Sequence, residues 1–154
     1  MPARILVCDD AWAIQRAVSF KLTRAGFEVE TASDGVEALE AIRRHRPDVL
    51  ITDCQMPRMD GFQLIEHLRS VPETATLPIF LLTARGFEFD HEQIKNQWQV
   101  CEVLAKPFSP RELVELIDRA LKESASGTNG SNHALNGKVA QETLQLRSPA
   151  VDRL

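Results

Sequence analysis

The sequence predicts an α/β fold in which a parallel sheet of five strands is covered by five helices, some on each face. Over residues 1–123, short apolar runs alternate with longer segments whose apolar side chains recur at helical spacing. Four of the five runs are almost wholly apolar, as strands of a parallel sheet are when both of their faces are buried. Strict alternation of strands and helices is typical of a doubly wound parallel sheet.

The strands are predicted from runs that are too short to be helices. The first run, Ile-Leu-Val-Cys, stops at two aspartates, and the third, Val-Leu-Ile-Thr, also stops at an aspartate. The second run, Phe-Glu-Val-Glu-Thr, alternates as a strand with one exposed face does. In chain order, the predicted strands are residues 5–8, 27–31, 49–52, 79–82 and 103–105.

The helices are predicted from apolar stripes and from residues that begin or end helices. Gly26 is a C-terminal stop for the first helix. Asp34 and Asp60 each precede a helical segment and have Glu or Gln three residues later, as in a capping box. Ser109 and Pro110 begin the last helix. The predicted helices cover about residues 14–25, 34–42, 60–68, 90–98 and 109–121.

The composition changes after residue 123. Residues 124–132 are rich in Ser, Gly and Asn, which is typical of a flexible linker. The following residues have at most a ragged helical period, and so short a segment cannot bury a useful core by itself. We therefore expect one domain over residues 1–123 and a flexible C-terminal tail or linker over residues 124–154.

Charge and cysteine usage exclude several classes of protein. The formal net charge is −4, and no basic stripe suggests binding to nucleic acid. The basic cluster at residues 43–46 falls where a helix is expected to end, and there it faces the negative end of the helix dipole. Three widely spaced cysteines favour neither a disulfide framework nor a zinc site. With no signal peptide or membrane span recognisable, we expect a cytoplasmic protein without membrane contacts.

Charged and hydroxylic residues follow four of the predicted strands. Asp9 and Asp10 follow the first strand, Asp53 the third, Thr83 the fourth and Lys106 the fifth. The carboxyl ends of parallel strands meet at one edge of the sheet, where ligands of such folds bind. Each residue alone has an ordinary interpretation, for example Asp10 as a helix cap and Lys106 as a surface cation. Their coincidence favours a single site.

Such a site favours phosphoryl chemistry with a metal. Three carboxylates raise one another's pKa unless cations compensate them, and one lysine is not enough. A cluster of acidic oxygen ligands favours a hard divalent ion, and Mg²⁺ is the usual ion where phosphate is handled. A carboxylate can itself attack phosphorus, which gives an acyl phosphate.

These residues resemble the receiver domain of two-component response regulators, including single-domain chemotaxis regulators, over about residues 3–123. The resemblance implies a flavodoxin-like sheet with the strand order 2-1-3-4-5. The motifs that carry it are Asp9-Asp10, residues 53–61 (Asp-Cys-Gln-Met-Pro-Arg-Met-Asp-Gly), Thr83-Ala84 and Lys106-Pro107-Phe108.

The resemblance implies a role for each site residue. Asp53 is the phosphoacceptor, Lys106 pairs with the phosphoryl group, and Thr83 is the switch hydroxyl. The peptide bond between Lys106 and Pro107 is expected to be cis. For Mg²⁺, the implied ligands are the carboxylates of Asp10 and Asp53 and the backbone carbonyl of Gln55, while Asp9 contributes through water.

The implied function is a signalling switch and not an enzyme that turns over an external substrate. A histidine kinase or a histidine phosphotransfer protein would donate the phosphoryl group, and phosphorylation would change the surface offered to a downstream protein. The alternatives are a phosphorelay intermediate or a part of a larger regulator whose output domain lies elsewhere. A receiver-like module that no longer accepts phosphate is disfavoured, because no site residue is lost.

The enzymatic alternative is an aspartate-based phosphohydrolase. These enzymes have a second acid two residues after the nucleophile, and here Gln55 occupies that position after Asp53. The general acid is therefore missing, which counts against turnover.

Several positions depart from the family pattern or allow two interpretations. Val103 stands where an aromatic residue is common, and Gln99-Val100 where a Gly-Ala pair is usual. We favour a core position over a partner-binding surface for three aromatic residues, Phe87, Phe89 and Trp98.

Three residues close to the site raise separate questions. We expect Gln55 and Arg85 to tune the lifetime of the phosphoryl group. Cys54 is better interpreted as a small residue that fills space beside the sheet than as a redox sensor.

Overall fold

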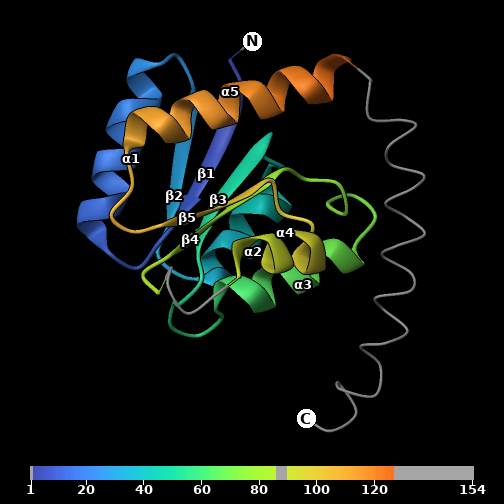
Figure 1. The fold of residues 1–154 in the computed structure, drawn as a ribbon. Helices are drawn as coiled ribbons and strands as arrows, with labels where there is room; N and C mark the ends of the chain where they lie inside the picture. The colour runs from blue at the N-terminus through green and yellow to red at the C-terminus, as the bar shows by residue number, and fades with distance from the viewer. Residues whose placement is uncertain (1, 86–89, 127–154) are drawn as a thin grey trace, which may run out of the picture. The chain divides into compact units, whose positions relative to one another are not determined.

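The computed structural model describes residues 2–85 and 90–126. Five strands form one sheet in the order β2-β1-β3-β4-β5, and every neighbouring pair is parallel. The predicted fold class and strand order are confirmed (Figure 1). The strands are β1 (Arg4–Cys8), β2 (Glu28–Ala32), β3 (Val49–Asp53), β4 (Ile79–Thr83) and β5 (Glu102–Ala105). The helices are α1 (Trp12–Arg24), α2 (Gly35–Arg44), α3 (Gly61–Ser70), α4 (His91–Trp98) and α5 (Pro110–Ser126).

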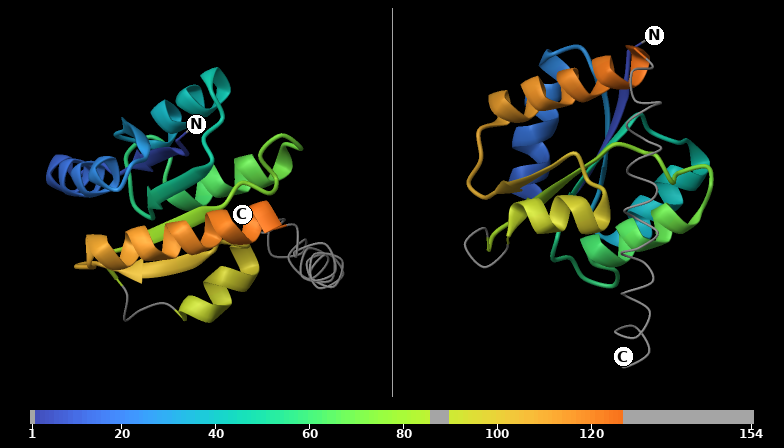
Figure 2. Two further views of the ribbon diagram at one scale, coloured as in Figure 1. Left: turned by 90° about the horizontal axis from the view of Figure 1, so that it is seen from above. Right: turned by 45° about the vertical axis from the view of Figure 1, so that its right-hand side comes forward.

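Helices cover both faces of the sheet. Figures 1 and 2 show α2, α3 and α4 on one face, and α1 with the beginning of α5 on the other. Side chains alternate between these faces along each strand. Leu6, Leu50 and Leu81 belong to the buried cluster beneath α2, α3 and α4. Their neighbours in sequence point the opposite way and are equally buried, which explains why the central strands are apolar throughout.

The predicted cap residues begin their helices. Asp34 accepts the N–H of Glu37 at 2.9 Å at the start of α2. Asp60 and Gln63 form a complete capping box at the start of α3. Ser109 accepts the N–H of Glu112 at 3.3 Å in front of α5. These bonds satisfy amide groups that the first turn of a helix leaves without partners.

Two helix boundaries differ from the sequence-based expectation. Helix α1 begins at Trp12, after an N-cap residue, Ala11, that makes no side-chain cap bond. Alanine is not a capping residue, and the apolar stripe predicts a start two residues later, at Ile14. Helix α5 continues to Ser126, so residues 124–126 are helical although they belong to the expected linker. Nothing in residues 122–126 is a strong helix breaker.

The chain divides into two units, residues 1–118 and residues 119–154. The first unit contains the whole sheet and the first turns of α5. Of the second unit, the structure describes the rest of α5. No helix within residues 2–85 and 90–126 is long and apolar enough to cross a bilayer.

Candidate phosphoryl-transfer site

Three aspartates meet at the carboxyl edge of the sheet. β1 and β3 are neighbours, and Cys8 is paired with Thr52, so the residues that follow these strands are adjacent. One carboxylate oxygen each of Asp9, Asp10 and Asp53 lies within 4.8 Å of the others. Asp9 and Asp53 are buried, whereas Asp10 is exposed. The structure therefore brings together the acidic residues that the sequence placed at the strand ends.

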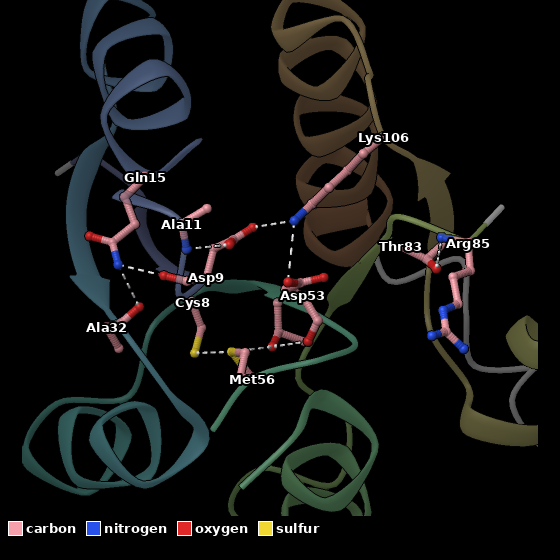
Figure 3. A network of polar contacts seen from close by, with 11 residues as sticks. Cys8, Asp9, Ala11, Gln15, Ala32, Asp53, Met56, Thr83, Arg85 and Lys106 are labelled. Carbon is pink, nitrogen blue, oxygen red and sulfur yellow. Dashed lines mark hydrogen bonds and ion pairs between the residues drawn. The ribbon is translucent and has the colours of Figure 1, made fainter. Parts of the chain in front are cut away.

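Lys106 supplies the positive charge of this cluster. Its Nζ lies 2.8 Å from Oδ2 of Asp9 and 3.2 Å from Oδ2 of Asp53 (Figure 3). The lysine side chain is only 15% exposed, which limits the screening of both ion pairs by solvent. The bond between Lys106 and Pro107 is cis, as expected.

The site shifts the pKa of the central carboxylate. Burial raises the pKa of Asp53, the negative charge of Asp9 raises it further, and Lys106 opposes both effects. Burial also disfavours the charged form of Lys106. Its hydrogen bond to Asp9 and the charges of Asp53 and Asp9 outweigh that effect, so the pKa of Lys106 is raised. The side chains of the site thus carry an excess of negative charge, because one lysine does not neutralise three carboxylates.

Asp9 is held in place by hydrogen bonds that were not predicted from the sequence. Its Oδ1 accepts the N–H of Ala11 at 2.8 Å, so Asp9, and not Asp10, binds the backbone at the start of α1. The side-chain amide of Gln15 donates to the carbonyls of Asp9 at 2.5 Å and of Ala32 at 3.2 Å (Figure 3). Gln15 lies at helical spacing from the apolar residues Val18 and Leu22. A polar residue on an apolar stripe is the sequence signal that could have pointed to this role.

Thr83 lies at the end of β4 and is buried. Its hydroxyl accepts the N–H of Arg85 at 3.0 Å. Figure 3 shows it set apart from the cluster of Asp9, Asp53 and Lys106. The structure therefore places four of the five predicted residues together, whereas the hydroxyl of Thr83 is buried at the end of β4, apart from them.

Gly61 follows the loop after Asp53 and packs closely against that residue. Its N–H donates to the carbonyl of Cys54 at 2.9 Å. A Cβ atom at position 61 would lie 2.2 Å from the carbonyl oxygen of Asp53, closer than real Cβ contacts. Glycine is needed here because of this close approach.

Two cysteines near the site, Cys8 and Cys54, are part of the buried hydrophobic cluster. Cys8 and Cys54 are buried, and burial raises the pKa of each thiol to about 12. A thiol must ionise to react, so neither residue suits redox sensing. This agrees with the sequence-based interpretation of Cys54.

Of the three aromatic residues near the fourth helix, the structure describes Trp98. Trp98 is half-buried and packs against Phe62, with ring centroids 5.3 Å apart. Val103 is buried in the same cluster. Phe87 and Phe89 lie outside the described residues, so their predicted position is not tested.

The donor set fits a hard divalent cation. It consists of carboxylate oxygens on two neighbouring strand ends, one of them solvent-exposed, with a single lysine as counter-charge. Hard ions such as Mg²⁺ prefer oxygen ligands and keep several waters. The exposed position of Asp10 leaves room for that water.

Comparison with known proteins agrees with this arrangement. The family described as the response regulator receiver domain matches residues 5–118. The doubly wound sheet, with three aspartates and a lysine at its carboxyl edge, is the arrangement expected from the resemblance to such a receiver, a signalling module. The chain belongs to the response regulator receiver family and has the function of a two-component receiver.

Curated relatives are longer than this chain. The alkaline phosphatase synthesis transcriptional regulatory protein PhoP of Bacillus subtilis is 33% identical over 149 residues, which are 95% of this chain and 61% of that protein. Response regulator MprA of Mycobacterium leprae is 39% identical over 122 residues, 79% of this chain and 52% of the relative. The chain thus spans roughly half to two thirds of the length of these relatives.

Solved structures of receivers superpose well on this fold. The chemotaxis response regulator CheY4 of Vibrio cholerae has a TM-score of 0.70 at 36% identity, with 77% of this chain and 98% of that chain covered. A response regulator receiver domain protein of Clostridium thermocellum has a TM-score of 0.71 at 29% identity, with coverages of 80% and 97%. Both are matched over nearly their whole length.

Proposed function

We propose that Asp53 is the phosphoacceptor of this receiver, with Lys106 and Thr83 as its catalytic partners. The observation that carries the proposal is the convergence of Asp9, Asp10, Asp53 and Lys106 at one edge of the sheet. Isolated strand-end acids are common, but here three carboxylates lie together and a single lysine pairs with two of them. Their mutual repulsion favours a site that takes up a further cation.

In the proposed reaction, a carboxylate oxygen of Asp53 attacks the phosphorus of the donor. The new O–P bond forms as the P–N bond to the donor's histidine breaks, and the freed imidazole takes up a proton. The ammonium of Lys106, now 3.2 Å from Oδ2 of Asp53, would pair with a phosphoryl oxygen. Thr83 at the end of β4 would donate a hydrogen bond from its hydroxyl to another phosphoryl oxygen once the phosphoryl group is present.

Asp10, Asp53 and the backbone carbonyl of Gln55 are the proposed direct ligands of Mg²⁺, with Asp9 acting through water. When bound, the metal supplies positive charge toward the phosphoryl oxygens. Asp9 also orients Lys106 through its 2.8 Å ion pair. The raised pKa of Asp53 supports a cation at this position, since neighbouring positive charge would restore the ionised form.

The proposed donor is a histidine kinase or a histidine phosphotransfer protein, and the signal leaves through a change in the surface offered to another protein. A chain that spans part of its relatives' length leaves two arrangements open. The receiver acts alone or as a phosphorelay intermediate, or it regulates an output domain of a larger protein.

Steady turnover of organophosphates is the competing function. Gln55 stands two residues after Asp53, where a phosphohydrolase needs an acid, and its side chain is exposed. An amide cannot protonate a leaving group. We therefore propose that the protein assists its own phosphorylation and dephosphorylation but does not turn over an external substrate.

The test is incubation with a small acyl phosphate and Mg²⁺, followed by intact-mass measurement. One phosphoryl adduct is expected on the unchanged protein and none on Asp53→Asn. No adduct on the unchanged protein would show that this receiver does not accept phosphate. Continuous phosphate release from varied organophosphates would instead establish a hydrolase.

A further inference from the structure

Residues 54–60, the loop that joins β3 to α3, carry the proposed metal ligand that has no side-chain donor. Gln55 would contribute a backbone carbonyl, and a carbonyl can be aimed only through the conformation of its loop. Whatever fixes this loop therefore also fixes a ligand. The close packing of Gly61 against Asp53 fixes the end of the loop next to α3.

Arg58, in the middle of the loop, has an unusual backbone conformation. Its φ is +66°, in the left-handed region that residues other than glycine seldom adopt. Such a conformation persists when surrounding contacts hold it in place. The contacts of the Arg58 side chain are therefore informative.

Arg58 forms a two-pronged ion pair with Asp34 at the start of α2. Nε lies 2.8 Å from Oδ2, and Nη2 lies 3.2 Å from Oδ1. The Asp34 side chain is only 8% exposed, and its Oδ1 also accepts the N–H of Glu37 at 2.9 Å. The carboxylate is thus anchored to α2, and Arg58 binds a fixed partner in a geometry that favours both hydrogen bonds.

A main-chain contact lies beside this ion pair. The N–H of Gly35 donates to the carbonyl of Met59 at 3.0 Å. A Cβ atom on Gly35 would lie 2.5 Å from that oxygen, so a side chain here would push the loop away. Side chain and backbone together dock the loop onto the first turn of α2.

We propose that Arg58 is a positioning residue for the metal site, because its ion pair with Asp34 holds the loop that presents the carbonyl of Gln55. This inference rests on the proposed function, and it adds a residue that touches neither metal nor phosphoryl group. Without the side chain of Arg58, the loop samples conformations in which that carbonyl points elsewhere. Binding of Mg²⁺ then requires the loop to be ordered first.

The test uses the full chain and two readouts from amide NMR spectra. Titration with Mg²⁺ alone gives the dissociation constant, and hydrogen exchange of the Gly35 amide without metal reports the docking of the loop. For Arg58→Ala we expect roughly tenfold weaker Mg²⁺ binding, comparable with losses at residues that orient metal ligands. Exchange at Gly35 is expected to become several-fold faster, in line with local opening of the loop.

Two further variants isolate the cause. Arg58→Gly tolerates the positive φ and removes the same ion pair, so it should also weaken Mg²⁺ binding. Arg44→Ala is the matched control, because Arg44 pairs with Glu30 at 3.0 Å on the exposed side of α2. It should leave both readouts unchanged.

The possible failures are distinguishable. If the unchanged protein binds no Mg²⁺, both the metal site and this inference are wrong. If it binds Mg²⁺ and both Arg58 variants keep the same affinity and the same Gly35 exchange, the inference alone is overturned. Recovery of full affinity in Arg58→Gly would also overturn it, since backbone strain and not the ion pair would then be decisive.

Discussion

The charge balance of the site depends on single residues, and it has its clearest effect on the pKa of Asp53. Its raised pKa means that the folded protein holds a proton on this carboxyl more tightly than the unfolded chain does. The contribution of Asp53 to stability is therefore lost as the pH rises from its ordinary pKa through the raised one. At neutral pH, ionised Asp53 destabilises the metal-free protein.

Asp53→Asn is expected to stabilise the metal-free protein. The change removes one of the mutually repelling charges, and a gain of about 1 kcal/mol would raise the unfolding temperature by roughly 2–4 °C. Thermal unfolding with a chelator present measures this difference. It should shrink as the pH falls and Asp53 becomes protonated. If the unchanged protein unfolded at a higher temperature than Asp53→Asn at neutral pH, charge repulsion at Asp53 would not be destabilising.

Lys106→Met is expected to have the opposite effect. It leaves Asp9 and Asp53 without their cation, which should cost about 1–3 kcal/mol, less than a fully buried pair because Lys106 is partly exposed. It should also slow labelling by an acyl phosphate. Denaturant titration and intact mass are the two measurements.

Lys95→Met is the control for this change. Lys95 pairs with Glu102 at 3.6 Å and is 25% exposed, but it lies outside the site. Its loss should cost less than 1 kcal/mol and leave labelling unchanged. If both substitutions changed the free energy of unfolding and the rate of labelling equally, Lys106 would have no specific role in the site.

At the scale of elements, the junction of β3 with α3 is the tightest part of the site. Gly61→Ala is expected to destabilise the protein by about 2–3 kcal/mol, because the added Cβ would meet the carbonyl of Asp53. The free energy of unfolding from denaturant titration measures the loss.

Gly26→Ala is the matched control. Gly26 has φ +100°, but a Cβ there would meet no atom within 4 Å. Backbone strain alone should cost about 1 kcal/mol. If Gly26→Ala were the more damaging change, close packing at Gly61 would not be the dominant constraint.

The elements show why most of the fold was predictable. The local signals were apolar runs of strand length and capping residues such as Asp34, Asp60 and Ser109. The structure confirms both, because the runs form strands and these residues cap their helices. The grouping of Asp9, Asp10, Asp53 and Lys106 followed from topology, because parallel strands end at one edge.

Contacts between distant elements were not predictable in the same way. The sequence does not show that Arg58 binds the carboxylate of Asp34 or that Gln15 binds the carbonyl of Ala32. These contacts depend on how the loops pack. Exposure was equally hidden. Trp12 and Phe20 are 68% and 64% exposed, although their apolar character alone suggests burial. Arg16 and Arg24 lie over these two rings.

At the scale of the whole molecule, the receiver is expected to function without residues 127–154. Every described strand and helix, and each proposed site residue, precedes that segment. A chain ending at Ser126 should have a free energy of unfolding within about 0.5 kcal/mol of that of the full chain, because it keeps every described strand and helix. It should accept a phosphoryl group equally fast. Loss of either property would show that the segment belongs to the domain.

The central claim is that Asp53 carries the phosphoryl group. The most direct measurement is to label the full chain with an acyl phosphate and Mg²⁺, reduce the product with borohydride, and map the peptides by mass spectrometry. Reduction converts an aspartyl phosphate to homoserine, and we expect homoserine at position 53 alone. Homoserine at Asp9 or Asp10, or a label that survives in Asp53→Asn, would contradict it.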